Sequence, residues 1–221
     1  MNQPSRDDFF TLIHKGLRRE LFAVTTLAAT IDWCDPHDVE GFDARWRELR
    51  HLLEIHAAHE DEHFLPLLGG RAPEILDSLA TEHDQQEAEL HGLSDLISET
   101  VVAPTEAGGL TVHRQLSAFV AGYLGHLLEE ETVVMPAIWE HCADEELASA
   151  RAAFLAAMPP ADAALSRRVM LPAMSPPERA RMLTMLRAAA PAPAFAAVLD
   201  DARQHLGDRA WRRLAADLEL Q

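Results

Sequence analysis

Apolar side chains recur every three or four residues along most of the chain, which is the spacing of one buried helical face. Runs of alternating apolar and polar residues, which would indicate strands, are absent from the sequence. The pattern predicts four long helices at about residues 5–31, 43–68, 73–100 and 110–141. Because the breaks between them are short, neighbouring helices should be antiparallel. The predicted fold is therefore all-α, an up-down-up-down four-helix bundle.

The C-terminal part of the chain predicts shorter helices. One covers about residues 144–158, and another follows "SPPERARMLTMLRAAA", in which Ser175 can cap the helix and Glu178 completes a capping box. Two short amphipathic helices complete the chain. We expect a bundle domain over residues 1–143 and a C-terminal helical extension over residues 144–221. With one histidine and no cluster of acids and histidines, the extension should serve packing or self-association, which allows a homodimer through these helices.

Charge and composition exclude several classes of partner. The 221 residues include 19 Lys and Arg against 36 Asp and Glu, a formal net charge of −17 at pH 7. This charge argues against nucleic acid and against an anionic membrane surface. No apolar run approaches the roughly 20 residues that a membrane span needs, and we expect a soluble, cytoplasmic protein. The two cysteines, Cys34 and Cys142, should lie at opposite ends of the bundle as free thiols.

An internal repeat carries the candidate chemistry. The segment "IHAAHEDEHFLP" and the segment "GHLLEEETVVMP" both contain His, three residues, Glu, five residues and Pro. The matched positions are His56 with His126, Glu60 with Glu130, and the two prolines, at a constant offset of 70 residues. A second histidine pair, His14 and His83, has an offset of 69 residues. The chain thus repeats a two-helix unit, with one His in its first helix and His-x-x-x-Glu in its second.

The spacing of these residues predicts a metal centre. Side chains four residues apart share one face of a helix, so each His-x-x-x-Glu pair points to one side. In antiparallel neighbours, His14 can lie level with His56, and His83 level with His126. Buried charges are costly unless they are paired or bind a metal. Two carboxylates can bridge two ions, with two imidazoles for each, and a helical bundle favours iron over manganese or zinc.

These residues resemble the pattern of the hemerythrin-like, HHE cation-binding family, in the variant that reads His, His-x-x-x-Glu, His, His-x-x-x-Glu. The resemblance covers about residues 6–142, and six residues fill the pattern in order: His14, His56, Glu60, His83, His126 and Glu130. It implies a four-helix bundle that encloses two non-heme iron ions with an oxo or hydroxo bridge. It also implies family roles in binding or sensing dioxygen, nitric oxide, peroxide or iron.

The sequence departs from the oxygen-carrying hemerythrins, which have His-x-x-x-His in the third helix and His-x-x-x-x-Asp in the fourth. Here Glu87 stands four residues after His83, and the acid of the fourth helix is Glu130, four residues after His126. One histidine of the carrier set is missing, which argues against simple reversible oxygen carriage. Four residues are candidates for an additional ligand or for contacts that support the ligands: Glu87, His63, His59 and Tyr123.

The leading functional hypothesis is a diiron protein that binds or senses a small oxidant, such as dioxygen, peroxide or nitric oxide, and that can also consume peroxide. Two alternatives stay open. One is an oxidative or peroxidase-type diiron enzyme that acts on an organic substrate, and an enzymatic activity would be catalase- or peroxidase-like or oxidase-like. The other is an iron-level sensor or interaction module. The sequence assigns no catalytic residue.

Overall fold

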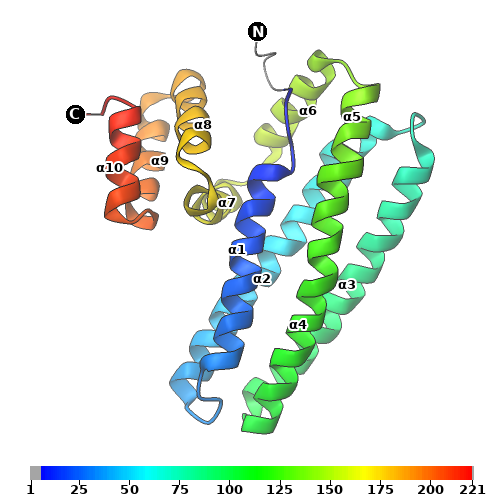
Figure 1. Cartoon of the computed structure of the whole chain (residues 1–221), viewed down its shortest axis with the longest axis vertical. Coiled ribbons are helices and arrows are strands. Elements are labelled where there is room, and N and C mark those ends of the chain that lie inside the picture. The colour runs from blue at the N-terminus through cyan, green and yellow to red at the C-terminus, as the bar shows by residue number, and fades with distance from the viewer. Residues whose placement is uncertain (1–5, 221) are drawn as a thin grey trace. The chain divides into compact units, whose positions relative to one another are not determined.

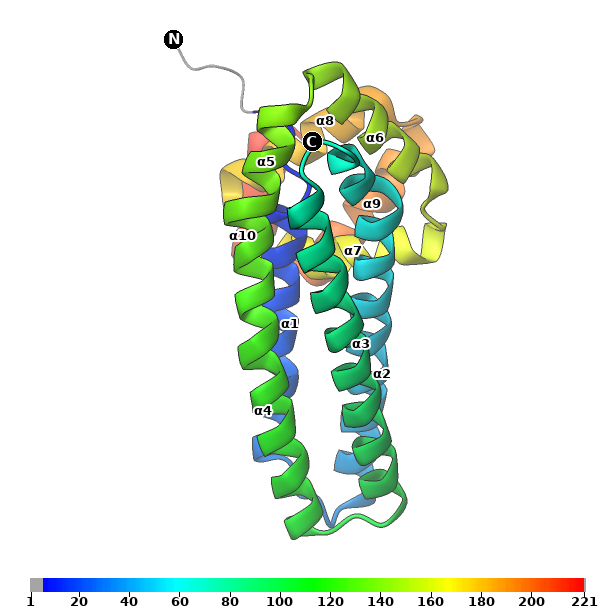
Figure 2. The same ribbon diagram turned by 90° about the vertical axis from the view of Figure 1, so that its right-hand side faces the viewer.

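The computed structural model describes residues 6–220. The first four long helices are α1 (Thr11–Thr30), α2 (Pro36–His59), α3 (Pro73–Val102) and α4 (Glu106–Glu129). They run side by side along one direction in Figures 1 and 2, and short connections join them. No strand occurs in the described part of the chain. The all-α prediction and the helical bundle are confirmed.

The starts of the helices differ from the predicted ones. The Asp8 carboxylate accepts hydrogen bonds from the backbone N–H groups of Phe10 and Thr11, at 3.0 and 2.9 Å, so α1 begins at Thr11. The predicted start of this helix, residue 5, lies outside the described residues. Helix α2 begins earlier than predicted, because Asp35 caps it and Pro36 occupies its first turn. Proline is favoured at the first helical position, where its missing N–H would have no partner within the helix.

Both repeats also contain a wider turn that the predicted continuous helices lack. After α2, the π-helical turn η1 (Glu60–Phe64) leads into the 3₁₀ turn η2 (Leu65–Leu68). After α4, the π-helical turn η3 (Glu130–Val134) leads into α5 (Met135–His141). In each repeat the backbone carbonyl of the glutamate accepts a hydrogen bond from the backbone N–H of the residue five positions later. Pro66 and Pro136 follow directly, and since proline has no N–H and clashes with the preceding turn, α-helical bonding cannot continue there.

The described chain forms two compact units. The first contains Glu20–Met158 and the residues before Leu12, and it includes α6 (Asp144–Ala157). One core cluster of this unit contains Phe9, Phe10, residues of η1, η2 and η3, Ile138 of α5 and Leu147 of α6. This cluster fixes the backbone of η1 and η3, whose first residues are Glu60 and Glu130.

The second unit contains Leu12–Arg19 of α1 together with the chain from Pro159 onward. Its helices are α7 (Pro160–Ala173), α8 (Pro176–Ala189), α9 (Ala192–His205) and α10 (Asp208–Asp217). The predicted capping box is present, with Glu178 accepting the N–H of Ser175 at 2.7 Å. Helix α7 is not among the predicted helices, and a proline lies in its first turn. The division expected after residue 143 stays a prediction.

Two further expectations concern the thiols and the membrane. Cys34 and Cys142 are both free cysteines, the first exposed and the second buried. Among the described helices, none is both long and apolar enough to cross a membrane.

A close contact between Trp33 and Gly109 ties the α1–α2 connection to α4. Trp33 packs against Phe42 and donates its indole N–H to the Ala28 carbonyl at 3.0 Å. A Cβ atom added at Gly109 would overlap the Trp33 ring. We expect Gly109→Ala to lower the free energy of unfolding by about 2–3 kcal/mol, the cost of overpacking a core. Gly122→Ala, where a Cβ meets nothing within 4 Å, should raise it by up to about 1 kcal/mol. Chemical denaturation measures both, and equal effects would contradict the contact.

Candidate metal centre

The six residues of the repeat pattern are all buried and come from every helix of the bundle. His14 lies in α1 and His83 in α3, while His56 and His126 lie in the last turns of α2 and α4. The two glutamates are the first residues of the π-helical turns. Both carboxylates are almost completely shielded, with Glu60 1% and Glu130 0% exposed. The structure therefore places the predicted ligands inside the protein, where a charge requires a partner.

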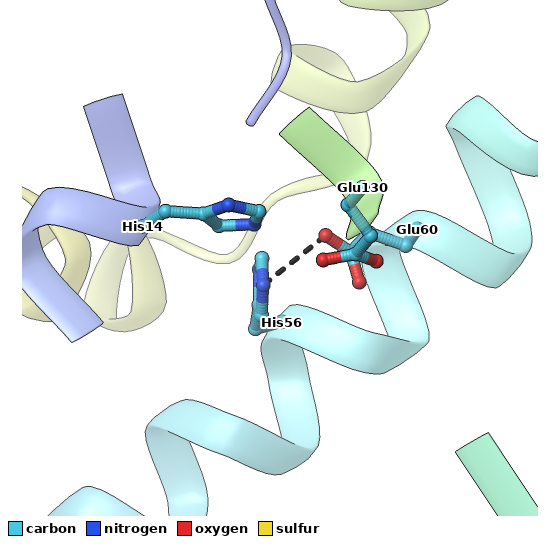
Figure 3. A group of neighbouring side chains, drawn as sticks. All are labelled: His14, His56, Glu60 and Glu130. Carbon is cyan, nitrogen blue, oxygen red and sulfur yellow. Dashed lines mark ion pairs between the residues drawn. The ribbon is translucent and has the colours of Figure 1, made fainter. Parts of the chain in front are cut away.

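Four of these residues form a first group, which Figure 3 shows. His14, His56, Glu60 and Glu130 each offer one ligand atom, and all four atoms lie within 4.8 Å of one another. Ligand atoms around one ion lie about 2.0–2.2 Å from it for nitrogen and oxygen. Because this places two opposite ligands a little over 4 Å apart, the spacing suits a single metal ion.

A second group shares its carboxylates with the first. Glu60, His83, His126 and Glu130 offer ligand atoms that also lie within 4.8 Å of one another. Each group thus combines two imidazoles with the same two carboxylates. Shared carboxylates of this kind are how helical bundles hold pairs of metal ions, and the arrangement suits two ions side by side.

The two His-x-x-x-Glu pairs have nearly the same geometry. His56 Nε2 lies 3.1 Å from Glu60 Oε1, and His126 Nε2 lies 3.3 Å from Glu130 Oε1. Residues four apart on a helix stack above one another, which explains the similarity. The repeat seen in the sequence is therefore also a repeat of side-chain placement.

His83 provides a test of whether a cation fits. Its Nε2 atom is buried and has no hydrogen-bond partner among the described residues. It lies 3.8 Å from Glu130 Oε1 and 3.9 Å from Glu60 Oε2, too far for hydrogen bonds. These distances suit three ligands around one ion, and buried polar atoms rarely lack partners. The second group therefore fits a metal ion.

The electrostatics at His83 also favour a positive charge in the site. Burial lowers the pKa of this imidazole, but Glu130, Glu60 and Asp61 raise it more strongly, so that the pKa rises from 6.5 to about 9. Without a metal, the carboxylates thus hold a proton at neutral pH on a residue that would otherwise lose it. A bound cation would take the place of that proton.

Two carboxylates that the sequence interpretation missed contact the histidines of the second group. Asp61 Oδ1 lies 2.9 Å from His83 Nδ1, and Glu82 Oε2 lies 3.1 Å from His126 Nδ1. Metal-binding histidines usually donate their other ring N–H to such a partner. The only sequence signal was adjacency, because Asp61 follows Glu60 and Glu82 precedes His83.

The additional candidates lie outside the two groups. Glu87 is exposed on α3 and belongs to neither group, and its role as an additional ligand stays a prediction. The rings of His59 and His63 lie 5.0 and 5.8 Å from that of Phe154 on α6, so both histidines pack in an aromatic cluster. Tyr123 is buried, and its ring lies 5.7 Å from that of His126. Burial and the charges of the two shared glutamates raise the pKa of this phenol.

A buried set of imidazoles and carboxylates inside a helical bundle defines a metal-binding bundle protein. Comparison with protein families identifies the family: residues 6–138 match the hemerythrin HHE cation binding domain. The chain belongs to this family, and its two His/Glu groups indicate a non-heme iron-binding protein. Comparisons with curated proteins and with solved structures gave no match.

Metal binding should depend on pH through His83. Since its pKa is about 9 without metal, the imidazole must lose a proton before Nε2 can bind an ion. We expect the affinity of the second group to rise about tenfold per pH unit from pH 7 to 9 and then to level off. Competition with a chelator of known affinity measures this. A flat profile over that interval would contradict the assignment of His83 as a ligand.

Proposed function

We propose that the chain is a non-heme diiron protein that binds or senses a small oxidant: dioxygen, peroxide or nitric oxide. The observation that carries the proposal is the pair of four-residue groups that share Glu60 and Glu130. In this proposal His14 and His56 bind one ion, His83 and His126 bind the other, and the two glutamates bridge them. Imidazole and carboxylate ligands in a helical bundle are typical of iron.

The number of protein ligands leaves room for an external molecule. Each ion would have two imidazoles and two carboxylate oxygens, whereas iron commonly has six ligands in octahedral geometry. The remaining positions are where a small oxidant would bind. Tyr123, against His126, keeps its proton at neutral pH, as an ordinary phenol does, and burial raises its pKa further. Its hydroxyl group can therefore donate a hydrogen bond near the second ion.

The proposal has three further parts. We propose slow peroxide consumption as a secondary activity, since open positions beside redox-active ions favour such chemistry. We propose a cytoplasmic location because both cysteines are free thiols, as is usual in a reducing compartment. We also propose that the helices of the second unit support a homodimer.

An anaerobic titration tests the oxidant. The protein is loaded with ferrous iron, and dioxygen, nitric oxide or hydrogen peroxide is added while the near-ultraviolet and visible absorption is recorded. We expect at least one of the three to change the absorption in proportion to the bound iron. Glu62→Gln, a change at an exposed carboxylate outside both groups, should behave as the unmodified protein. Iron-loaded protein that responds to none of the three would contradict the proposal.

The two alternatives make different predictions. A diiron enzyme that oxidises an organic substrate should consume peroxide only when an organic donor is added. A catalase-like activity needs no donor, because peroxide serves as both oxidant and reductant. An iron-level sensor requires that metal loss destabilise the bundle.

A further inference from the structure

Two carboxylates outside the ligand set contact the imidazoles of the second group. Asp61 Oδ1 lies 2.9 Å from His83 Nδ1, and Glu82 Oε2 lies 3.1 Å from His126 Nδ1. A carboxylate accepts hydrogen bonds, so each contact places the N–H of the ring on Nδ1. The other ring nitrogen, Nε2, is then left to face the shared glutamates, as the 3.3 Å distance from His126 Nε2 to Glu130 shows.

The two contacts also link three elements of the bundle in sequence. Asp61, on η1, directly follows the shared ligand Glu60 and reaches across to His83 on α3. Glu82, on α3, directly precedes His83 and reaches across to His126 on α4. A residue next to one ligand thus holds the ligand on another helix. The side chains of Asp61 and Glu82 are 56% and 31% exposed, whereas those of the histidines are 8% and 3% exposed.

This exposure decides what the carboxylates can do. A buried ion pair tends to be needed for folding, because removal of one partner leaves an uncompensated charge inside the protein. Asp61 and Glu82 are reached by solvent, and after replacement of Asp61 the imidazole of His83 still faces Glu60 and Glu130, so the buried charge keeps partners. Their contribution should therefore be to the orientation and basicity of the imidazoles and not to the stability of the bundle.

We propose that Asp61 and Glu82 are positioning residues that set the affinity of the second group for its metal ion. The proposal rests on the proposed function only in requiring that His83 and His126 bind a metal. Each carboxylate fixes one imidazole with Nε2 toward the ion. The hydrogen bond also makes that imidazole a stronger metal ligand. Loss of such an outer contact typically weakens metal binding about 10–100-fold.

The experiment measures stepwise affinities of the full chain for cobalt(II), with a competing chelator and the visible absorption of the bound ion as readouts. The variants are Asp61→Asn, Asp61→Ala, Glu82→Gln and Glu82→Ala. We expect each alanine variant to weaken one binding step about 10–100-fold, with a shifted cobalt absorption for that step. The other step should stay unchanged. The amide variants should lose less, because an amide oxygen still accepts the N–H of the ring.

Matched controls separate the hydrogen bond from the loss of a negative charge. Glu62→Gln changes the exposed residue next to Asp61, and Glu87→Gln changes an exposed carboxylate on the same helix as Glu82. Neither residue belongs to the metal groups, so both controls should keep the affinities of the unmodified protein. Melting of the metal-free variants should stay close to that of the unmodified protein, which a purely structural role would not allow.

Three results would overturn the proposal: equal weakening of both binding steps, no weakening in the alanine variants, or equal weakening in the controls. The outcome is separable from that of the proposed function. Unmodified protein that binds one cobalt ion, weakened by Asp61→Ala, would contradict the diiron centre but support the positioning role. Unmodified protein that binds two cobalt ions, with no weakening in the variants, would support a two-metal centre but contradict the positioning role.

Discussion

Glu130→Ala is expected to abolish binding of both ions of the proposed diiron centre, an effect that among single substitutions only Glu60→Ala should equal. The carboxylate is fully buried and belongs to both ligand groups. Its loss therefore takes one ligand from each ion and the bridge between them. Glu60→Ala should act in the same way, because Glu60 is the other shared residue. Metal analysis of the purified variants measures the effect.

The control for this prediction is Glu87→Ala, which removes an exposed carboxylate outside both groups. It should retain all of the iron. In the metal-free protein Glu130 lies 3.8 Å from the imidazole of His83, so melting of the metal-free variant is recorded beside its iron content to separate loss of metal from loss of folding. Retention of one tightly bound ion in Glu130→Ala would show that this glutamate does not bridge.

Removal of the metal should lower the melting temperature markedly. The six ligands come from four helices and two π-helical turns, so an ion bound to them stabilises only the folded bundle. At a free metal concentration 1,000-fold above the dissociation constant, one site contributes about 4 kcal/mol. For a chain of this size that corresponds to about 8–16 °C. Calorimetry of iron-loaded and chelator-treated protein under anaerobic conditions measures the difference.

The same scan of Glu130→Ala is the control, because a variant that binds no metal should melt at one temperature with and without iron. Equal melting of loaded and chelated unmodified protein would contradict a metal centre that joins the helices. It would also exclude the iron-level sensor, which depends on destabilisation when metal is lost.

The six candidate ligands could be predicted because two regularities combine. Side chains four residues apart share a helical face. Neighbouring antiparallel helices bring together residues that lie at the same level along the bundle. An offset of 70 residues then distinguishes His56 and His126 from the neighbouring histidines. His59 and His63 have no counterpart at that offset, and the structure places them against Phe154 instead.

The supporting carboxylates could not be found by the same rule. The position that corresponds to Asp61 in the second repeat is Glu131, and the one that corresponds to Glu82 is Ile13. A search for identical residues therefore passes over both contacts, although the first position is acidic in both repeats. They depend on which rotamers reach across to the next helix, and sequence spacing does not determine this.

The π-helical turns and the exposure of Glu87 are two further features that sequence spacing did not predict. Pro66 and Pro136 belong to the repeat, and they act on the hydrogen bonds of the preceding turn, which the spacing of apolar residues does not show. On α3 the buried stripe passes through Leu79, His83, Leu90 and Leu93, and Glu87 falls just beside it. Position i+4 lies about 40° around the helix from position i, so a residue four positions after a ligand at the edge of the buried stripe can fall outside that stripe.

The iron content of protein purified under anaerobic conditions tests the central claim most directly. The two groups that share Glu60 and Glu130 predict two iron ions per chain, together with a near-ultraviolet absorption band after oxidation. One zinc ion per chain, or a chain that takes up no iron, would contradict the diiron centre.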